Sequence, residues 1–190
     1  MPVYILDDEA PGDHRMGAAQ RWWLHHSLQA LFDALAEKGA PLVLKRGGAV
    51  AEIEALMKET GATHIHATRA YEPWWQELDE QLGDRLTLHD GNYLAPPATV
   101  RTGSGGRYKI FTPYWRALAD RMPPAKPHRA PAKIDGVAAK SDTLGGWDLL
   151  PTKPDWAKDF DTWMPGEAGA REALDDFLGE AADYDHARNM

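Results

Sequence analysis

The sequence predicts an α/β fold in which short buried strands alternate with helices and pair in parallel. Over residues 2–91, short apolar runs alternate with helical segments of about 10–20 residues, a pattern typical of βαβ units. Gly61 closes one of these helical segments and Pro73 opens another. A chain of 190 residues with 43% hydrophobic content is long enough for one domain with a real core. We therefore expect a Rossmann-like, doubly wound parallel sheet with helices on both faces, followed by a long connector and a C-terminal helix.

The expected elements follow one another closely in the first half of the chain. The first strand is "PVYILDD", a short buried run that ends in acids, and the helix His14–Gly39 follows it. The next elements are a strand at 40–48, a helix at 49–61, a strand at 63–72, a helix at 73–83 and a strand at 84–91. After Asn92 the alternation stops, and residues 107–122 indicate an aromatic loop that leads into a short helix.

The second half of the chain has a different character. Residues 123–165 are rich in Pro, Gly and Trp and show no sustained periodicity, which indicates a long connection rather than a second core. Residues 165–190 indicate a final helix, with Pro165 and Glu167 at its start. The sequence thus predicts an α/β domain at 1–121, a connector at 122–165 and the beginning of a further part at 166–190.

Composition excludes several classes of site. The absence of cysteine excludes disulfides, thiolate metal sites and cysteine nucleophiles, and makes a cytoplasmic location the default expectation. A net charge of -8 argues against non-specific nucleic-acid binding by the domain as a whole. No apolar run approaches the roughly 18 residues that span a bilayer, so we expect no membrane partner. The usual Gly-rich phosphate loops of α/β folds are also absent.

The first long helix carries an unexpected tryptophan. At 100° per residue, its core-facing stripe consists of Leu24, Leu28, Leu31, Phe32 and Leu35. Trp22 falls on the opposite side, where a helix should be polar. We expect this ring to cover a neighbouring loop or domain, with ligand contact as the alternative.

The sequence contains two close pairs of histidines, of which only one has the spacing of a metal pair. His25 and His26 are adjacent, so they point about 100° apart and cannot chelate one ion. His64 and His66 lie on one face of a predicted strand and could form a pair. Because no third ligand follows at a suitable spacing, we expect two hydrogen-bonded histidines rather than a metal site.

The stretch "YEPWW" (Tyr71–Trp75) follows the carboxyl end of a predicted strand. Ligands of open α/β sheets lie at that edge. The two tryptophans begin a helix and could stack a flat heterocycle, while helix N–H groups could bind an anionic tail. An aromatic lid over the core explains the same residues equally well. Both interpretations remain open at this point.

Taken together, several segments resemble the N-terminal part of DNA photolyases in the photolyase/cryptochrome family, most strongly the bacterial enzymes of the cyclobutane-pyrimidine-dimer type. The likeness runs from residue 2 to the end, in the family's order, through "PVYILDDEAPGDHRMGAAQRWWLHHSL", "GGRYKIFTPYWRAL", "LLPTKPDWAKDF", "PGEAGAREALDDFLG" and "YDHAR". The resemblance implies a lyase that binds a pyrimidine dimer in damaged DNA and splits it by light-driven electron transfer from reduced FAD. It also implies that the α/β domain carries an antenna chromophore, often methenyltetrahydrofolate, which passes excitation energy to the flavin.

The resemblance nominates individual residues. "HRM" matches a folate-contacting His-x-Met stretch, which implies that His14 contacts the antenna chromophore. Trp74 and Trp75 stand where well-known family members have a polar pair on the folate, so folate, a flavin and a deazaflavin all remain possible. "YDHAR" resembles the Tyr-x-x-x-Arg at which the family's catalytic domain begins. This implies FAD contact by Tyr184 and DNA phosphate contact by Arg188.

Two features of the family are absent from this sequence: the opening strand, which sits in the middle of the sheet, and the helical FAD and DNA domain beyond its first helix, which 166–190 would supply. We therefore expect an internal piece of a monomeric enzyme that does not repair DNA by itself. We also expect marginal stability, because two sheet edges lack a partner strand. The alternatives are a cryptochrome-type blue-light photoreceptor and, from another class, a free-standing α/β nucleotide-binding module.

Overall fold

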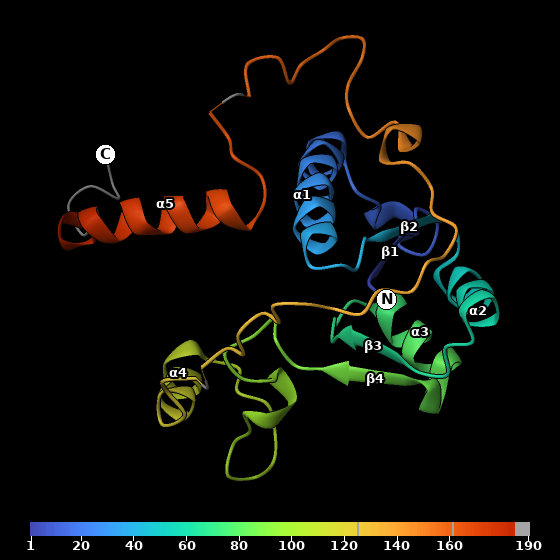
Figure 1. The fold of residues 1–190 in the computed structure, drawn as a ribbon. Coiled ribbons are helices and arrows are strands. Elements are labelled where there is room, and N and C mark those ends of the chain that lie inside the picture. Colours follow the sequence, from blue (N-terminus) through green and yellow to red (C-terminus); the bar gives the residue numbers. More distant parts are fainter. Residues whose placement is uncertain (125, 161, 185–190) are drawn as a thin grey trace. The chain divides into compact units, whose positions relative to one another are not determined.

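The computed structural model describes residues 1–124, 126–160 and 162–184. The chain forms two compact units: Met1–Thr60 together with Pro131–Met190, and Gly61–Ala130. Each unit contains one pair of parallel strands with a helix in the connection between them (Figure 1). The α/β class with parallel strands is therefore confirmed. None of the helices in the described ranges is long and apolar enough to span a lipid bilayer.

The first unit is built on β1 (Val3–Leu6) and β2 (Val43–Arg46), with Val3 opposite Val43 in the register. The connecting helix α1 (Ala18–Glu37) begins after Gly17, whose N–H donates to Oε1 of Gln20 at 3.2 Å. At its other end, Gly39 adopts a φ of +87° and the Ala40 N–H donates to the Leu35 carbonyl at 3.0 Å. This is the left-handed helix end that glycine favours, and it directs the chain into β2.

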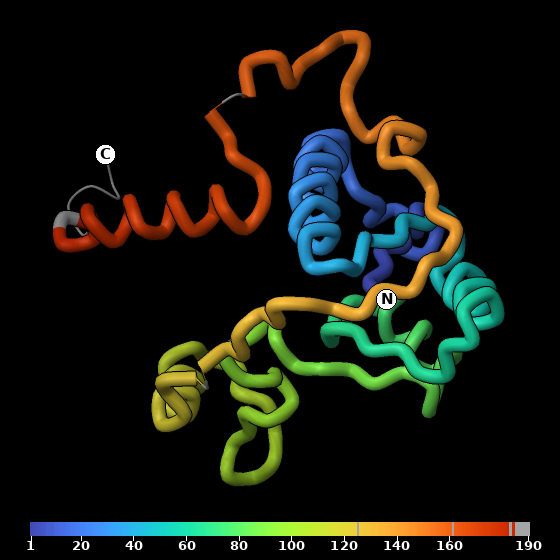
Figure 2. The backbone as a smooth tube through the Cα atoms, in the orientation of Figure 1, coloured from blue at the N-terminus to red at the C-terminus, as the bar shows by residue number. Residues whose placement is uncertain are grey.

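The core of the first unit combines residues from two parts of the chain that are far apart in the sequence. Its buried residues are Leu6, Leu28, Leu42, Leu44, Trp147 and Leu149. The last two belong to the predicted connector, which runs back along β2 (Figure 2). There the Leu44 N–H donates to Ser141 Oγ at 2.9 Å, and the Asp142 N–H donates to the Leu44 carbonyl at 2.9 Å. This part of the connector is thus a structural component of the α/β core.

One prediction about the first long helix is wrong in part. Leu28 is buried, and Leu24 and Leu35 pack against the core, as the helical stripe predicts. Leu31 and Phe32, however, are exposed. The apolar stripe is wider than the surface that the two strands and the returning connector cover, so its outer residues remain at the surface.

The second helix of the chain, α2 (Ala49–Thr60), follows β2 and is held at its start by Asp7. One carboxylate oxygen of Asp7 accepts the Ala49 N–H at 2.9 Å, and the other accepts the N–H groups of Glu9 and Ala10 at 3.0 and 2.9 Å. Burial raises the pKa of Asp7, but these three N–H groups outweigh it and hold the pKa below its ordinary value. Asp7 therefore has a structural role at the end of β1.

The second unit is built on β3 (Ile65–Thr68) and β4 (Leu86–His89), joined by α3 (Pro73–Leu82). Ile65 lies opposite Leu86, and burial alternates along both strands, so one face of the pair is half-buried and the other is exposed. A short helix, α4 (Phe111–Ala119), follows a long loop. Near the end of the chain lies α5 (Glu167–Glu180), the predicted C-terminal helix.

Candidate functional site at the carboxyl ends of β3 and β4

Polar side chains join the two loops that leave the carboxyl ends of β3 and β4. The Arg69 N–H donates to the His89 carbonyl at 2.8 Å, continuing the pairing of the strands by one residue. Nε of Arg69 lies 3.1 Å from Oδ1 of Asp90. Nδ2 of Asn92 donates to the Arg69 carbonyl at 2.9 Å. These bonds fix the backbone of both loops at the edge where α/β sheets bind ligands.

Two tyrosines complete this edge. The rings of Tyr71 and Tyr93 meet edge to face, with centroids 5.1 Å apart. They border a shallow surface hollow lined by Arg69, Tyr71, Asp90, Gly91, Asn92, Tyr93 and Pro96. Pockets that enclose a drug-sized ligand have roughly 300–1,000 Å³. The hollow encloses far less space than that, so it is a surface feature rather than a ligand pocket.

Trp74 and Trp75 begin α3, next to this edge in the sequence. Trp75 is 43% exposed, and Trp74 is half-buried. The exposure of Trp75 argues against a lid over the core for this residue. The N–H groups of Trp75 and Gln76 both point to the Glu72 carbonyl, at 3.0 and 3.4 Å, so two donors of the first turn are already used. Neither tryptophan lines the hollow between the tyrosines.

His14 lies in the other unit. It ends the short helical turn η1 (Gly12–His14), and its side chain is exposed. Close to it in the sequence, Asp8 forms ion pairs with Arg21 and with Arg46, the latter at 2.9 Å. Burial raises the pKa of Asp8, but the hydrogen bonds and charges of the two arginines outweigh it, and the pKa lies below its ordinary value. This carboxylate therefore stays ionised as a link between β1, α1 and β2.

The helix α1 carries no metal site in the described residues, since no three His, Asp or Glu side chains there are arranged to hold an ion. Trp22 is half-buried: its ring contacts His26 at a centroid distance of 4.5 Å and Phe160 at 5.3 Å. The expectation that a loop covers Trp22 is thus confirmed, and the loop is the predicted connector. Trp23 makes a similar contact with Trp163, with centroids 6.4 Å apart.

Residues 1–132 match the family described as DNA photolyase. The chain belongs to the DNA photolyase family. It is 42% identical over 201 residues to the deoxyribodipyrimidine photo-lyase of Agrobacterium fabrum, covering 100% of this chain and 41% of that protein. It is 27% identical to cryptochrome-2 of Arabidopsis thaliana, covering 99% of this chain and 33% of that protein.

A solved structure gives the same result. The crystal structure of a bacterial class III photolyase from Agrobacterium tumefaciens matches with a TM-score of 0.90 at 41% identity, covering 100% of this chain and 41% of that chain. The chain thus spans about two fifths of the length of these photolyase relatives. Membership of the DNA photolyase family implies, in general terms, a flavin and an antenna chromophore.

The residues of this photolyase-family chain fit these groups to different degrees. Tyr184 is 48% exposed and packs its ring against Phe177, with centroids 5.4 Å apart, so it could contact a flavin only as part of a larger site. Arg188 lies outside the described residues. The exposed indole of Trp75 offers a flat apolar face on which a chromophore ring could stack.

Several residues of this site could not be predicted from "YEPWW" alone. The sequence pattern points to Tyr71 but not to Arg69, Asp90, Asn92 or Tyr93. A usable signal was present, since "HDGN" (89–92) ends the strand predicted at 84–91. The rule that places ligands at the carboxyl ends of parallel strands applies to both strands equally.

Proposed function

We propose that this chain is the light-harvesting part of a deoxyribodipyrimidine photo-lyase, which splits cyclobutane pyrimidine dimers in DNA with light. The observation that carries the proposal is the likeness over the whole chain to a bacterial photolyase of that name. The cryptochrome relatives are less similar, so a blue-light photoreceptor is the second candidate.

The antenna chromophore we propose is methenyltetrahydrofolate, with Trp74 and Trp75 as contacts and, from the family resemblance alone, His14 as a further contact. A bound folate supplies absorption of near-ultraviolet light and transfer of that energy to FAD. For the chain's own residues, the exposed face of Trp75 would stack on the flat ring system, with Trp74 beside it. Arg69 and Asn92 hold the loops in place through Asp90 and the Arg69 carbonyl.

The remaining roles are proposed from the same likeness. Tyr184 would contact FAD, and Arg188 would contact a phosphate of the damaged DNA. The parts of the chain are proposed to be the antenna domain at 1–121, the connector at 122–165 and the first helix of the FAD-binding domain at 166–190. The absence of cysteine supports a cytoplasmic enzyme, which we propose to be a monomer.

A hybrid protein tests this function. The part of the Agrobacterium fabrum relative that aligns with this chain is replaced by this chain, and light-dependent loss of pyrimidine dimers is measured against wavelength. We expect repair driven both by flavin absorption and by a separate antenna band. In the hybrid carrying Trp75→Ala, the antenna band should be lost while flavin-driven repair persists. A hybrid that repairs dimers through flavin absorption but shows no separate antenna band would contradict the proposal.

A further inference from the structure

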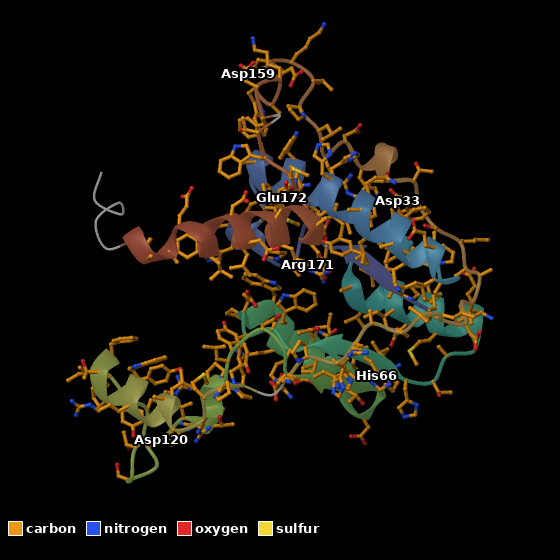
Figure 3. All side chains as sticks on the ribbon, turned by 60° about the vertical axis from the view of Figure 1, so that its left-hand side comes forward. Asp33, His66, Asp120, Asp159, Arg171 and Glu172 are labelled. Atoms are coloured by element: carbon orange, nitrogen blue, oxygen red, sulfur yellow. The ribbon has the colours of Figure 1, made fainter. Side chains whose placement is uncertain are left out.

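Two imidazoles meet on the exposed face of the β3–β4 pair. Nδ1 of His66 lies 3.0 Å from Nε2 of His89, and the ring centroids are 5.2 Å apart. His66 is in register with Thr87, so His89 is its diagonal neighbour on the adjacent strand. Both side chains are exposed, and His66 is labelled on its strand in Figure 3. The sequence pairs His66 with His64, whereas the structure pairs it across the strands.

We propose that His66 and His89 together bind a divalent transition-metal ion of the Zn²⁺ class. Neutral imidazole nitrogens are preferred ligands of such ions, and they bind Zn²⁺ at about 2.0–2.1 Å. Tetrahedral geometry then separates two ligand nitrogens by roughly 3.3 Å. The observed 3.0 Å is within a small side-chain movement of that value, which two exposed rings on rigid strands can make.

A two-ligand site requires two ring nitrogens that are held close together, and His66 and His89 already meet this requirement. One ring donates its N–H to the bare nitrogen of the other, and the tautomers decide which ring is the donor. The ion would take the position of that shared proton, and water would complete its coordination. Zn²⁺ binding therefore requires the donor ring to carry its proton on its other nitrogen, so that both facing nitrogens are bare and can bind the ion.

The groups around the pair determine how tightly we expect it to bind the metal ion. Nδ1 of His64 is 3.0 Å from Thr63 Oγ1, and the Asp90 carboxylate is paired with Arg69. Among the described residues, no third His, Asp or Glu completes a metal-binding group. With two protein ligands, we expect moderate affinity and tighter binding of Cu²⁺ than of Zn²⁺.

Calorimetric titration of the tag-free 190-residue chain with ZnCl₂ tests the proposal. We expect one site that weakens by at least about tenfold in His66→Gln and equally in His89→Gln, because each variant removes one of two ligands. His64→Gln is the matched control, since it changes the exposed histidine that directly precedes β3. The Zn²⁺ affinity of this variant should equal that of the parent. Circular dichroism should show that all three variants fold like the parent, because the three side chains are exposed.

The heat stability of the same proteins gives a second readout. Zn²⁺ should raise the melting temperature of the parent and of His64→Gln, because a ligand that binds only the folded state stabilises it. It should raise that of His66→Gln and His89→Gln by less. Equal Zn²⁺ affinity in the parent and in folded His66→Gln would overturn the proposal, as would an equal loss of affinity in His64→Gln.

Discussion

Replacing Trp147 by alanine should remove much of the stability of the first unit. The indole is 3% exposed and packs with Leu6, Leu28 and Leu149. A buried tryptophan hides about 150–250 Å² of surface, which at ~25 cal/mol/Å² corresponds to roughly 4–6 kcal/mol. Alanine retains a small part of this, and measured Trp→Ala changes in cores cost about 3–5 kcal/mol. Since whole domains are stable by about 5–15 kcal/mol, this is a large fraction.

The indole N–H adds a smaller contribution. It donates to Oδ2 of Asp142 at 3.2 Å, and because Asp142 is exposed, water replaces this bond when the indole is removed. Trp147→Phe should therefore lose only about 1–2 kcal/mol, from the hydrogen bond and a slightly smaller ring.

Urea unfolding followed by circular dichroism measures these free energies. The matched control is Trp163→Ala, the same change at a ring that is 60% exposed on the same connector, for which we expect a loss below about 1 kcal/mol. If Trp147→Ala were no more destabilising than Trp163→Ala, the connector would not belong to the core, and the reasoning would be refuted.

Three further predictions concern the first unit. Asp7→Ala should cost about 0.5–2 kcal/mol in urea unfolding, because the Ala49 N–H at the start of α2 loses its acceptor. Burial and the neighbouring His26 lower the pKa of His25 in the folded state, so the free energy of unfolding should fall as pH drops through about 6.5, and His25→Gln should flatten that part of the profile. A double-mutant cycle on Trp22→Ala and Phe160→Ala should give a coupling of about 0.5–1.5 kcal/mol, and no coupling would mean that the connector does not cover Trp22.

The regular elements were predictable because their signals are local. Alternating apolar runs predicted each strand, and Gly39 marked the end of α1 that its φ of +87° confirms. Trp147 and Leu149 could not be placed in the core, because the connector around them has no periodicity and their burial depends on contact with β2. Leu31 was expected to be buried and is exposed, because its burial likewise depends on which other segments pack against α1.

The sequence predicted only the part of the candidate site that follows from the order of strands and helices. The carboxyl-end rule predicted the position of Tyr71, but pairwise geometry decides the rest. Arg69 meets Asp90 and Tyr71 meets Tyr93 only because β3 and β4 are neighbours in parallel register. Spacing in the sequence, as in His64 and His66, does not show which side chain lies across the strands.

Chromophore binding by the chain itself tests the central claim most directly. The 190-residue protein is mixed with methenyltetrahydrofolate, passed over a desalting column, and its near-ultraviolet absorption is compared with that of Trp75→Ala and Trp163→Ala. Stacking of one ring contributes about 1–3 kcal/mol, so Trp75→Ala should bind roughly 5–150-fold more weakly, while Trp163→Ala should bind like the parent. Folate absorption retained by the parent and lost in Trp75→Ala is the predicted result. A parent that retains no folate, or a Trp75→Ala protein that retains as much as the parent, would contradict the account.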